Sequence, residues 1–433
     1  MSFLAIIIIL SPYLSKPISI VTGQILVMAL LSFFVVQIYV CPRYRFVLKY
    51  RFLMLALFMF IYPHIISFIQ RAGVDFNLLK IQISVAAVTI LGFVINFWNN
   101  RYTNLPPPTL IICKLFVGVI VFNSIVVLLE FYFPALRFML EGFLIPDGKV
   151  DYFDGLRYRG LASAGGASLS VAHGVGAVFL YYLFRKGLVG PFITCTSLAI
   201  IVASLIFIGR TGFVIVVMGF ITVKYLTHSI TKKITISFVV GSFVILCFSI
   251  LVAVYIQDVF YSLPPHYQNY SVNVFLGGIE GLKSEGTVSY VASFYSFPNS
   301  FPSLLLGTGN FSGGFDFGYK WPGDPGIMKM FTAYGVFGGG LFYLGIVVWC
   351  FSLPKGDLRD VLSVLVVLLM CTEFKEPLLF KGYSARLFWI FFGFSLYQRG
   401  ILAIKNSLNW DSLEPKVIDF DNKSTDKPPS IKC

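Results

Sequence analysis

Charged side chains are scarce in this chain: Asp, Glu, Lys and Arg make up 12% of its 433 residues, against 57% hydrophobic residues. Soluble domains carry about a quarter charged residues, so this composition excludes an ordinary soluble protein. The net charge is +13, but no basic soluble face is present. Binding to nucleic acid would need such a face, so that class of function is excluded too.

Cysteine and histidine are also few and scattered, with seven and four residues respectively. No cysteine lies in residues 257–328, the longest polar segment, so we expect no disulfide framework there. No cysteines stand at metal-ligand spacing and the histidines are isolated, so we expect neither a metal centre nor a cofactor.

Apolar runs of about 20 residues recur along the chain, each long enough to cross about 30 Å of hydrocarbon. The 46 Phe and 23 Tyr suit lipid-facing and interfacial packing. We predict an all-α polytopic membrane protein with about twelve transmembrane helices. The predicted spans are residues 2–14, 18–40, 52–70, 78–98, 110–131, 167–184, 188–208, 212–226, 234–256, 329–351, 361–379 and 384–400. The first is short, and a signal peptide is its alternative, but no basic region precedes it.

Lysine and arginine gather in short loops on one side of this twelve-span arrangement. They are Arg43, Arg45, Lys49, Arg51, Arg185, Lys186, Lys224, Lys232, Lys233, Lys355, Arg359, Arg399 and Lys405. Short basic loops face the cytoplasm. We therefore predict cytoplasmic termini and external segments at 131–166 and 257–328. Residues 1–405 form the transmembrane domain, and 406–433 form a polar cytoplasmic tail with the composition of a disordered segment.

The predicted external segment 257–328 is long, and glycine-rich motifs close it. They are Gly307-Thr-Gly309, Asp324-Pro-Gly326 and, opening the next apolar helix, Tyr334-Gly335-Val-Phe-Gly338. A transporter rarely needs so much polar chain on one face, whereas an enzyme acting on a membrane-bound substrate does. We predict that this segment is folded. We also predict that the glycine cluster from Gly335 to Gly340 allows close helix approach.

Three arginines fall on the predicted external side. Arg157 and Arg159 precede the sixth span, and Arg210 lies at the turn between the seventh and eighth spans. An arginine between apolar spans either snorkels to the interface or has an anionic partner. Its planar fork suits phosphate oxygens. We therefore predict that the three bind a lipid pyrophosphate, with interfacial anchoring and salt bridges as the alternative.

Asp324 stands at the mouth of the tenth span, on the same predicted side as these arginines. Its carboxylate could activate an acceptor hydroxyl as a general base or bind the sugar. Asp before Pro is also a common helix start, and the two roles are compatible. Five more charged residues flank the last hairpin: Glu373, Lys375, Glu376, Lys381 and Arg386. Mutual ion pairing is expected for them, and a further cationic contact to the lipid is the alternative.

In order and spacing, these motifs resemble the O-antigen polymerase (Wzy-type) and O-antigen ligase superfamily of bacterial envelope glycan enzymes. The likeness covers about residues 150–345. It consists of Arg157-x-x-Gly160, Arg210-Thr-Gly212, the long external segment, Gly307-Thr-Gly309, Asp324 and Tyr334-Gly335-Val-Phe-Gly338.

Two departures from the family pattern matter. Ala164-Gly165-Gly166 stands where the family often has Pro-Asn. Asp324 stands where the ligase branch typically has His. The second departure favours a polymerase over a ligase.

The resemblance implies a metal-independent glycosyltransferase with a GT-C-like membrane fold in the bacterial inner membrane. Its substrates would be undecaprenyl-pyrophosphate-linked oligosaccharides on the external face. Asp324 and Arg210 would be catalytic, and Arg157, Arg159 and Arg210 would bind the pyrophosphate. A chain-length regulator and a flippase are the implied partners. An O-antigen ligase is one alternative. A lipid-linked oligosaccharide flippase is another, but it should have short loops and a charged central cavity.

Overall fold

The computed structural model describes residues 61–70, 75–102, 108–144, 158–162, 166–209, 211–226, 300–311, 325–380 and 382–407. Within these ranges the protein is helical and has no strand, which confirms the all-α prediction for this part of the chain. Residues 61–69 are helical. The other helices are α4 (Phe76–Tyr102), α5 (Pro108–Tyr132), α6 (Pro134–Leu144), α7 (Ala167–Arg185), α8 (Pro191–Ile208), α9 (Thr211–Leu226), α14 (Phe301–Leu306), α15 (Gly326–Phe351), α16 (Asp357–Glu373) and α17 (Tyr383–Ser407).

Five of the described helices are long and apolar enough to cross a membrane: α4 as far as Asn96, α5, α7, α8 and α15. This supports a multi-pass membrane protein. Where the predicted spans between 52 and 400 fall on described residues, the helices follow them, although several begin or end a few residues away. The predicted spans 2–14, 18–40 and 234–256 lie outside the described residues.

Proline marks the start of three of these helices. Pro108, Pro134 and Pro191 are the first residues of α5, α6 and α8. Proline suits this position because its φ is fixed at a helical value. Its missing backbone N–H costs nothing there, because N–H groups in the first turn have no partner within the helix. The local sequence therefore sets where these helices begin.

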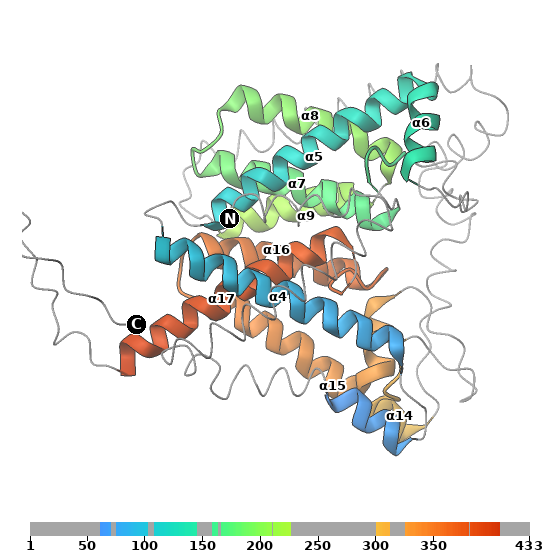
Figure 1. Ribbon diagram of the computed structural model, residues 1–433, viewed down its shortest axis with the longest axis vertical. Coiled ribbons are helices and arrows are strands. Elements are labelled where there is room, and N and C mark those ends of the chain that lie inside the picture. Colours follow the sequence, from blue (N-terminus) through green and yellow to red (C-terminus); the bar gives the residue numbers. More distant parts are fainter. Residues whose placement is uncertain are drawn as a thin grey trace, which may run out of the picture.

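The helix α7 lies at the centre of the bundle, between α5 and α8 on one side and α9 and α17 on the other (Figure 1). It is buried along almost its whole length. Close packing depends on two of its glycines. A Cβ at Gly174 would lie 2.7 Å from the carbonyl oxygen of Gly212 on α9, and one at Gly176 would lie 2.7 Å from a methyl carbon of Ile120 on α5. Small residues at such crossings bring helix backbones together in membranes.

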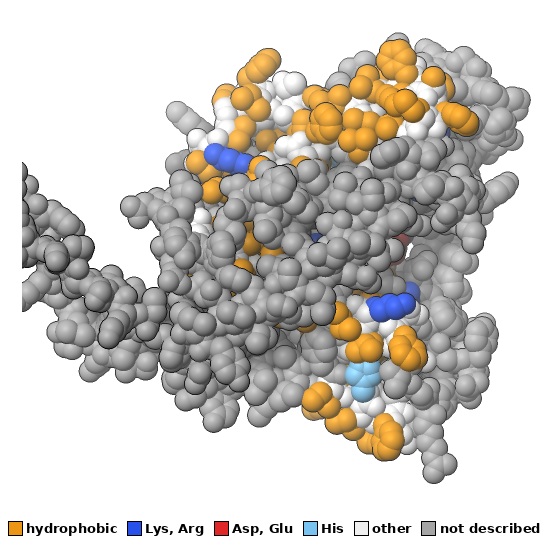
Figure 2. All heavy atoms as spheres, viewed as in Figure 1, with side chains coloured by type: hydrophobic (Ala, Val, Ile, Leu, Met, Phe, Trp, Pro, Cys, Tyr) orange, Lys and Arg blue, Asp and Glu red, His pale blue; other side chains and the backbone are white. Residues whose placement is uncertain are grey.

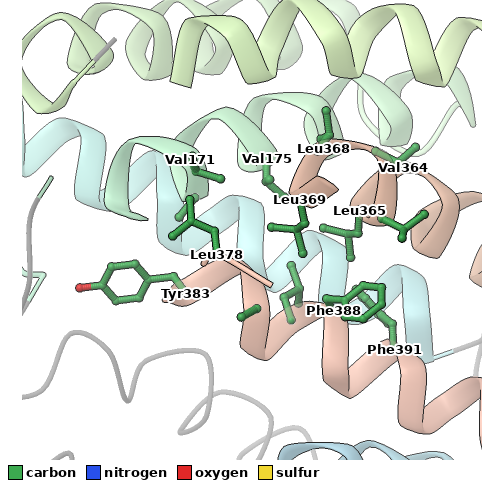
Figure 3. Close-up of a cluster of buried hydrophobic side chains, with 14 of the residues drawn as sticks. Val171, Val175, Val364, Leu365, Leu368, Leu369, Leu378, Tyr383, Phe388 and Phe391 are labelled. Carbon is green, nitrogen blue, oxygen red and sulfur yellow. The ribbon is translucent and has the colours of Figure 1, made fainter. Parts of the chain in front are cut away.

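A second close crossing joins α4 to α17. Added Cβ atoms at Gly92 and Gly393 would each overlap the backbone of the opposite helix. The amide of Asn96 donates to the carbonyl oxygen of Phe394 at 3.3 Å. Apolar side chains then join α17 to the centre: Figure 3 shows Val175 of α7 near Leu369 of α16, with Phe388 and Phe391 of α17 below Leu365 of α16.

The outer surface of the described helices is apolar. Phe138 on α6 is 84% exposed and Phe192 on α8 is 81% exposed. Figure 2 shows hydrophobic side chains gathered over the region of α5, α6 and α8, with few charged side chains among them. A surface of this kind suits lipid rather than water.

The structure differs from the predicted spans in two places. The span predicted at 361–379 ends early, because α16 stops at Glu373 and a turn follows. Pro377 cannot continue a helix. In addition, α15 is not continuous, because Gly335 has φ 71° and ψ 169° in its interior. The helix begins at Gly326, nine residues before this glycine, so Gly335 breaks the helix rather than opening it.

The loop that follows α7 meets the first turn of α16, directly after the loop that follows α15, at one end of the bundle. Lys186 Nζ lies 2.8 Å from Asp357 Oδ1 and 3.5 Å from Asp360 Oδ2. The hydroxyl of Tyr182 also donates to Asp357, at 2.9 Å. Burial disfavours the ammonium, but the hydrogen bond and charge of Asp357, together with Asp360, outweigh it and raise the pKa of Lys186. The contact is consistent with placing both loops on the same side of the membrane.

Candidate functional site

The opposite end of the bundle brings together segments that are far apart in the sequence. We call it the site end. It is formed by residues 158–162, the first turns of α7, α9 and α15, and the turn at residues 374–380. In Figure 1 it lies on the right, where α5 meets α6 and α14 meets α15. With Pro325, the N-cap of α15, these segments include or directly adjoin every site residue predicted from the sequence.

Residues 158–162 are held between α5 and α7 by side chains of α5. Asn123 Nδ2 donates to the carbonyl oxygen of Arg159 at 3.3 Å, and Asn123 Oδ1 accepts from the N–H of Leu161 at 2.8 Å. Glu130 Oε2 accepts from the N–H of Gly160 at 2.9 Å. Three backbone groups around Arg159 are therefore fixed by two polar side chains.

The neutral form of His173 completes this network from α7. Its Nδ1 lies 2.9 Å from the carbonyl oxygen of Leu169, which can only accept, so Nδ1 carries the hydrogen. Its Nε2 lies 3.3 Å from the amide nitrogen of Asn123 and accepts from it. Asn123 thus uses both donor hydrogens and its oxygen. A buried polar group with every partner in place makes the loop position well defined.

Gly160 has a conformation and a location that other residues fit poorly. Its φ is +61°, and an added Cβ would overlap the side-chain oxygen of Asn123. The glycine of the motif Arg157-x-x-Gly160 is therefore explained by the local structure. The glycine lets the chain turn against α5 directly after the two arginines.

Tyr158, between those two arginines, anchors the same loop through its ring. The ring centroid lies 5.9 Å from that of Phe131 and 5.6 Å from that of Phe207, at the ends of α5 and α8. The guanidinium carbon of Arg137 lies 4.5 Å above the Tyr158 ring. This aromatic cluster fixes the backbone between Arg157 and Arg159.

The hairpin between α8 and α9 is held by a single hydroxyl group of α7. Ser170 Oγ accepts from the N–H of Gly212 at 2.8 Å and donates to the carbonyl oxygen of Gly209. A Cβ at Gly212 would lie 2.5 Å from the carbonyl oxygen of Ser170, so only glycine fits here. The residues flanking Arg210 are thereby fixed on both sides.

A lysine from the 374–380 turn reaches the same hairpin. Lys375 Nζ donates to Thr211 Oγ1 at 3.2 Å, linking two residues that are 164 positions apart. Lys375 is exposed. The turn that carries it also touches α7, because a Cβ at Gly382 would overlap the hydroxyl of Ser168.

Glu373 lies beneath the start of α15. Its side chain is 1% exposed. Oε2 accepts from the Tyr343 hydroxyl at 2.8 Å, and Oε1 accepts from the N–H of Leu379 at 2.6 Å. A Cβ at Gly326 would overlap Oε2, so the carboxylate sits against the first residue of α15, where the helix dipole favours negative charge. The mutual ion pairing expected for the charged residues of the last hairpin stays a prediction.

The break in α15 is filled by the motif Gly307-Thr-Gly309. The N–H of Thr308 donates to the carbonyl oxygen of Thr332 at 2.7 Å, and that of Gly309 donates to Ala333 at 3.0 Å. The loop backbone replaces the helical bonds that Gly335 interrupts. The amide of Gln70 binds the carbonyl oxygen of Gly307 at 2.6 Å, which ties in the helix at 61–69.

Of the predicted site residues, Arg159 lies within the described residues. It is 8% exposed, so it is buried rather than displayed on an external surface. Arg157, Arg210 and Asp324 lie outside the described residues, but each adjoins a described one: Tyr158, Gly209 and Thr211, or Pro325. An Asp-Pro helix start would place Asp324 at the N-cap of α15. In the structure Pro325 is the N-cap, so Asp324 precedes the cap by one residue.

Sequence reasoning missed the side chains that hold these segments: Asn123, Glu130, Ser170 and His173. A signal was present, since each is a polar residue in or at the end of an apolar run. Polar side chains in a membrane span are costly unless they have partners there. Their partners are backbone groups of distant loops, which hydropathy does not identify.

In the described part of the chain, no three His, Cys, Asp or Glu side chains come together in a group that could hold a metal ion. Comparison of the chain with protein-family models, with curated proteins and with solved structures finds no match in any of the three.

Proposed function

We propose that this protein polymerises undecaprenyl-pyrophosphate-linked oligosaccharide repeat units of O-antigen, capsule or exopolysaccharide type. It would act as a metal-independent glycosyltransferase of GT-C type on the external face of the bacterial inner membrane. The observation that carries the proposal is the convergence at the site end of residues 158–162, the α8–α9 hairpin and the start of α15. These are the segments in which the sequence places its arginines and Asp324.

The proposed reaction moves the growing glycan from its lipid carrier to the next lipid-linked unit. An acceptor hydroxyl at the non-reducing end of that unit attacks the anomeric carbon of the growing chain. A new glycosidic bond forms, the bond from that carbon to the pyrophosphate oxygen breaks, and undecaprenyl pyrophosphate leaves. Arg157, Arg159 and Arg210 stabilise the negative charge on the leaving group, and Asp324 accepts the hydroxyl proton.

Glu373 is less suited than Asp324 to act as the base. Both of its oxygens accept hydrogen bonds from the protein, and it is almost completely buried against Gly326. Its contacts assign it a structural role, which is to hold the start of α15 and the 374–380 turn in place. This supports Asp324, two residues before Gly326, as the base.

The broken helix α15 is a feature also found at the binding sites of transporters. There, interrupted helices leave backbone groups that bind the substrate or ion. Here the carbonyl oxygens of Thr332 and Ala333 are occupied by Thr308 and Gly309. The break thus serves to dock a loop, which favours the polymerase over a flippase.

Reconstitution tests the proposal directly. Purified protein in nanodiscs is incubated with undecaprenyl-pyrophosphate-linked repeat units, and the products are separated by chain length. A ladder of lipid-linked polymers is expected from the wild type and not from Asp324→Asn. A product formed only when lipid A core is added would indicate a ligase, and unchanged substrate under all conditions would refute both.

A further inference from the structure

The turn at residues 374–380, which follows α16, is held by hydrogen bonds on several sides, and we call it the platform. The N–H groups of Lys375 and Glu376 both donate to the carbonyl oxygen of Thr372, at 2.8 and 3.0 Å. Glu373 binds the N–H of Leu379, and the indole of Trp389 donates to the carbonyl oxygen of Leu379 at 2.8 Å. The backbone that carries Lys375 is therefore fixed, although the lysine side chain itself is exposed.

This platform places a cation at the α8–α9 hairpin. Lys375 Nζ lies 3.2 Å from Thr211 Oγ1, and the hairpin is in turn fixed to Ser170 on α7. Thr211 is bonded to Arg210, so the Cα atoms of the two residues are about 3.8 Å apart. The structure thus brings a lysine from the far end of the sequence to the residue beside the predicted pyrophosphate-binding arginine.

An ammonium at this position suits a phosphate oxygen. It carries three donor hydrogens, and its contact with Thr211 uses one of them. Lysine contacts phosphate as a point charge, without the paired geometry that arginine provides. A fixed backbone also lowers the entropic cost of ordering the side chain on binding.

We propose that Lys375 is a further substrate-binding residue, whose ammonium contacts a phosphate oxygen of the lipid pyrophosphate at the α8–α9 hairpin. The inference rests on the proposed function, because it names another ligand of the same substrate. It adds a residue that lies outside the segment, about 150–345, on which the family resemblance depends.

A purely structural role is the competing explanation. In that case Lys375 only ties the turn to Thr211, and removal of either partner has the same effect. Two substitutions separate these roles. Lys375→Met keeps the length of the side chain and removes its charge, whereas Thr211→Val removes the hydroxyl partner and keeps the shape of the side chain.

The experiment measures binding of farnesyl pyrophosphate to the full-length protein in detergent by titration calorimetry, with farnesol as the uncharged control. Thermal stability is measured in parallel. Lys375→Met should weaken binding about tenfold, Lys375→Arg should keep most of it, and Thr211→Val should bind as the wild type does. Lys355→Met, an exposed lysine in the loop after α15, serves as the matched control and should not change binding.

Unchanged affinity in Lys375→Met, or equal losses in Lys375→Met and Thr211→Val, would overturn the inference. Absence of pyrophosphate-dependent binding in the wild type would overturn it as well. Because the readout is binding rather than polymer formation, these results are distinct from a failure of the proposed function. A protein that binds the pyrophosphate through Lys375 but makes no polymer would refute the polymerase and retain the contact.

Discussion

The hydroxyl of Ser170 accepts a hydrogen bond from the backbone N–H of Gly212, 2.8 Å away and 42 positions along the chain. The same hydroxyl donates to the carbonyl oxygen of Gly209. One side chain of the central helix therefore holds the backbone on both sides of Arg210 and Thr211. The close approach of Gly212 to the backbone of Ser170 makes this possible, since a side chain at position 212 would separate the two helices.

Ser170→Ala should loosen this hairpin. The N–H of Gly212 then lacks a partner in a buried place, which costs about 1–3 kcal/mol. Thermal unfolding in detergent should show the loss. If the proposed function is correct, polymer formation should fall with it, because the backbone on both sides of Arg210 is no longer held. Ser363→Ala is the matched control: Ser363 on α16 is fully buried, and its hydroxyl has no hydrogen-bond partner within the described residues. An equal loss in both variants would show that the Ser170 bonds contribute nothing specific.

Gly335→Ala should disrupt the break in α15. The backbone at Gly335 has φ 71° and ψ 169°, a region that other residues rarely adopt, and an added Cβ would overlap the backbone of Leu305. We expect a loss of about 3 kcal/mol in stability, measured by thermal unfolding. Gly345→Ala, on the same helix with open space around it, should be neutral. Wild-type stability in Gly335→Ala would mean that the break does not persist in the membrane.

The extent to which the sequence predicts the fold follows from the physics of the bilayer. A helix that crosses about 30 Å of hydrocarbon needs about 20 apolar residues, so hydropathy located α5, α7 and α8 to within a few residues. The break in α15 could not be found this way, because the run stays apolar on both sides of Gly335. What opens the helix there is contact with Gly307 and Leu305, residues outside the predicted span.

The candidate site was predictable in part for a similar reason. Charged residues at the ends of apolar runs are visible in the sequence, and on this ground the arginines and Asp324 are predicted as site residues. The side chains that hold the neighbouring backbone are uncharged or buried, such as Asn123 and Ser170, and their partners are backbone groups of loops. Such contacts depend on which helices pack together, and composition does not encode that.

Lys186 should stabilise the opposite end of the bundle in a pH-dependent way. Its pKa is raised by Asp357 and Asp360 despite the opposing effect of burial. A raised pKa means that the contribution is fully present below the pKa of the unfolded chain, about 10.4, and is lost as the pH rises through the folded value. Because the side chain is 34% exposed, we expect about 0.5 kcal/mol.

Thermal unfolding of Lys186→Met from pH 7 to pH 11 checks this sign. The wild type should be slightly more stable than the variant at neutral pH, and the difference should shrink above about pH 10.4. Lys355→Met, in the loop after α15 at the same end of the bundle, serves as the control for general effects of lost charge. A difference that grows with pH would contradict the assignment.

The arginines provide the sharpest test of the proposed chemistry. If Arg157 and Arg210 bind the pyrophosphate, Arg→Ala at either position should remove roughly 3–5 kcal/mol of transition-state stabilisation, or about two to four powers of ten in rate. Arg→Lys should not restore the rate, because a point charge cannot reproduce two parallel hydrogen bonds. The measurement is polymer length and rate with purified lipid-linked repeat units, alongside protein level in the membrane.

The variants should still insert, since removing a charge from the predicted external side does not weaken the positive-inside signal. Arg359→Ala, in the first turn of α16 at the opposite end of the bundle, is the matched control and should retain activity. Full-length polymer at the wild-type rate from well-expressed Arg157→Ala and Arg210→Ala would leave both arginines as interfacial anchors. In that case the charge on the leaving group would have to be stabilised elsewhere, and buried Arg159 would be the next residue to replace.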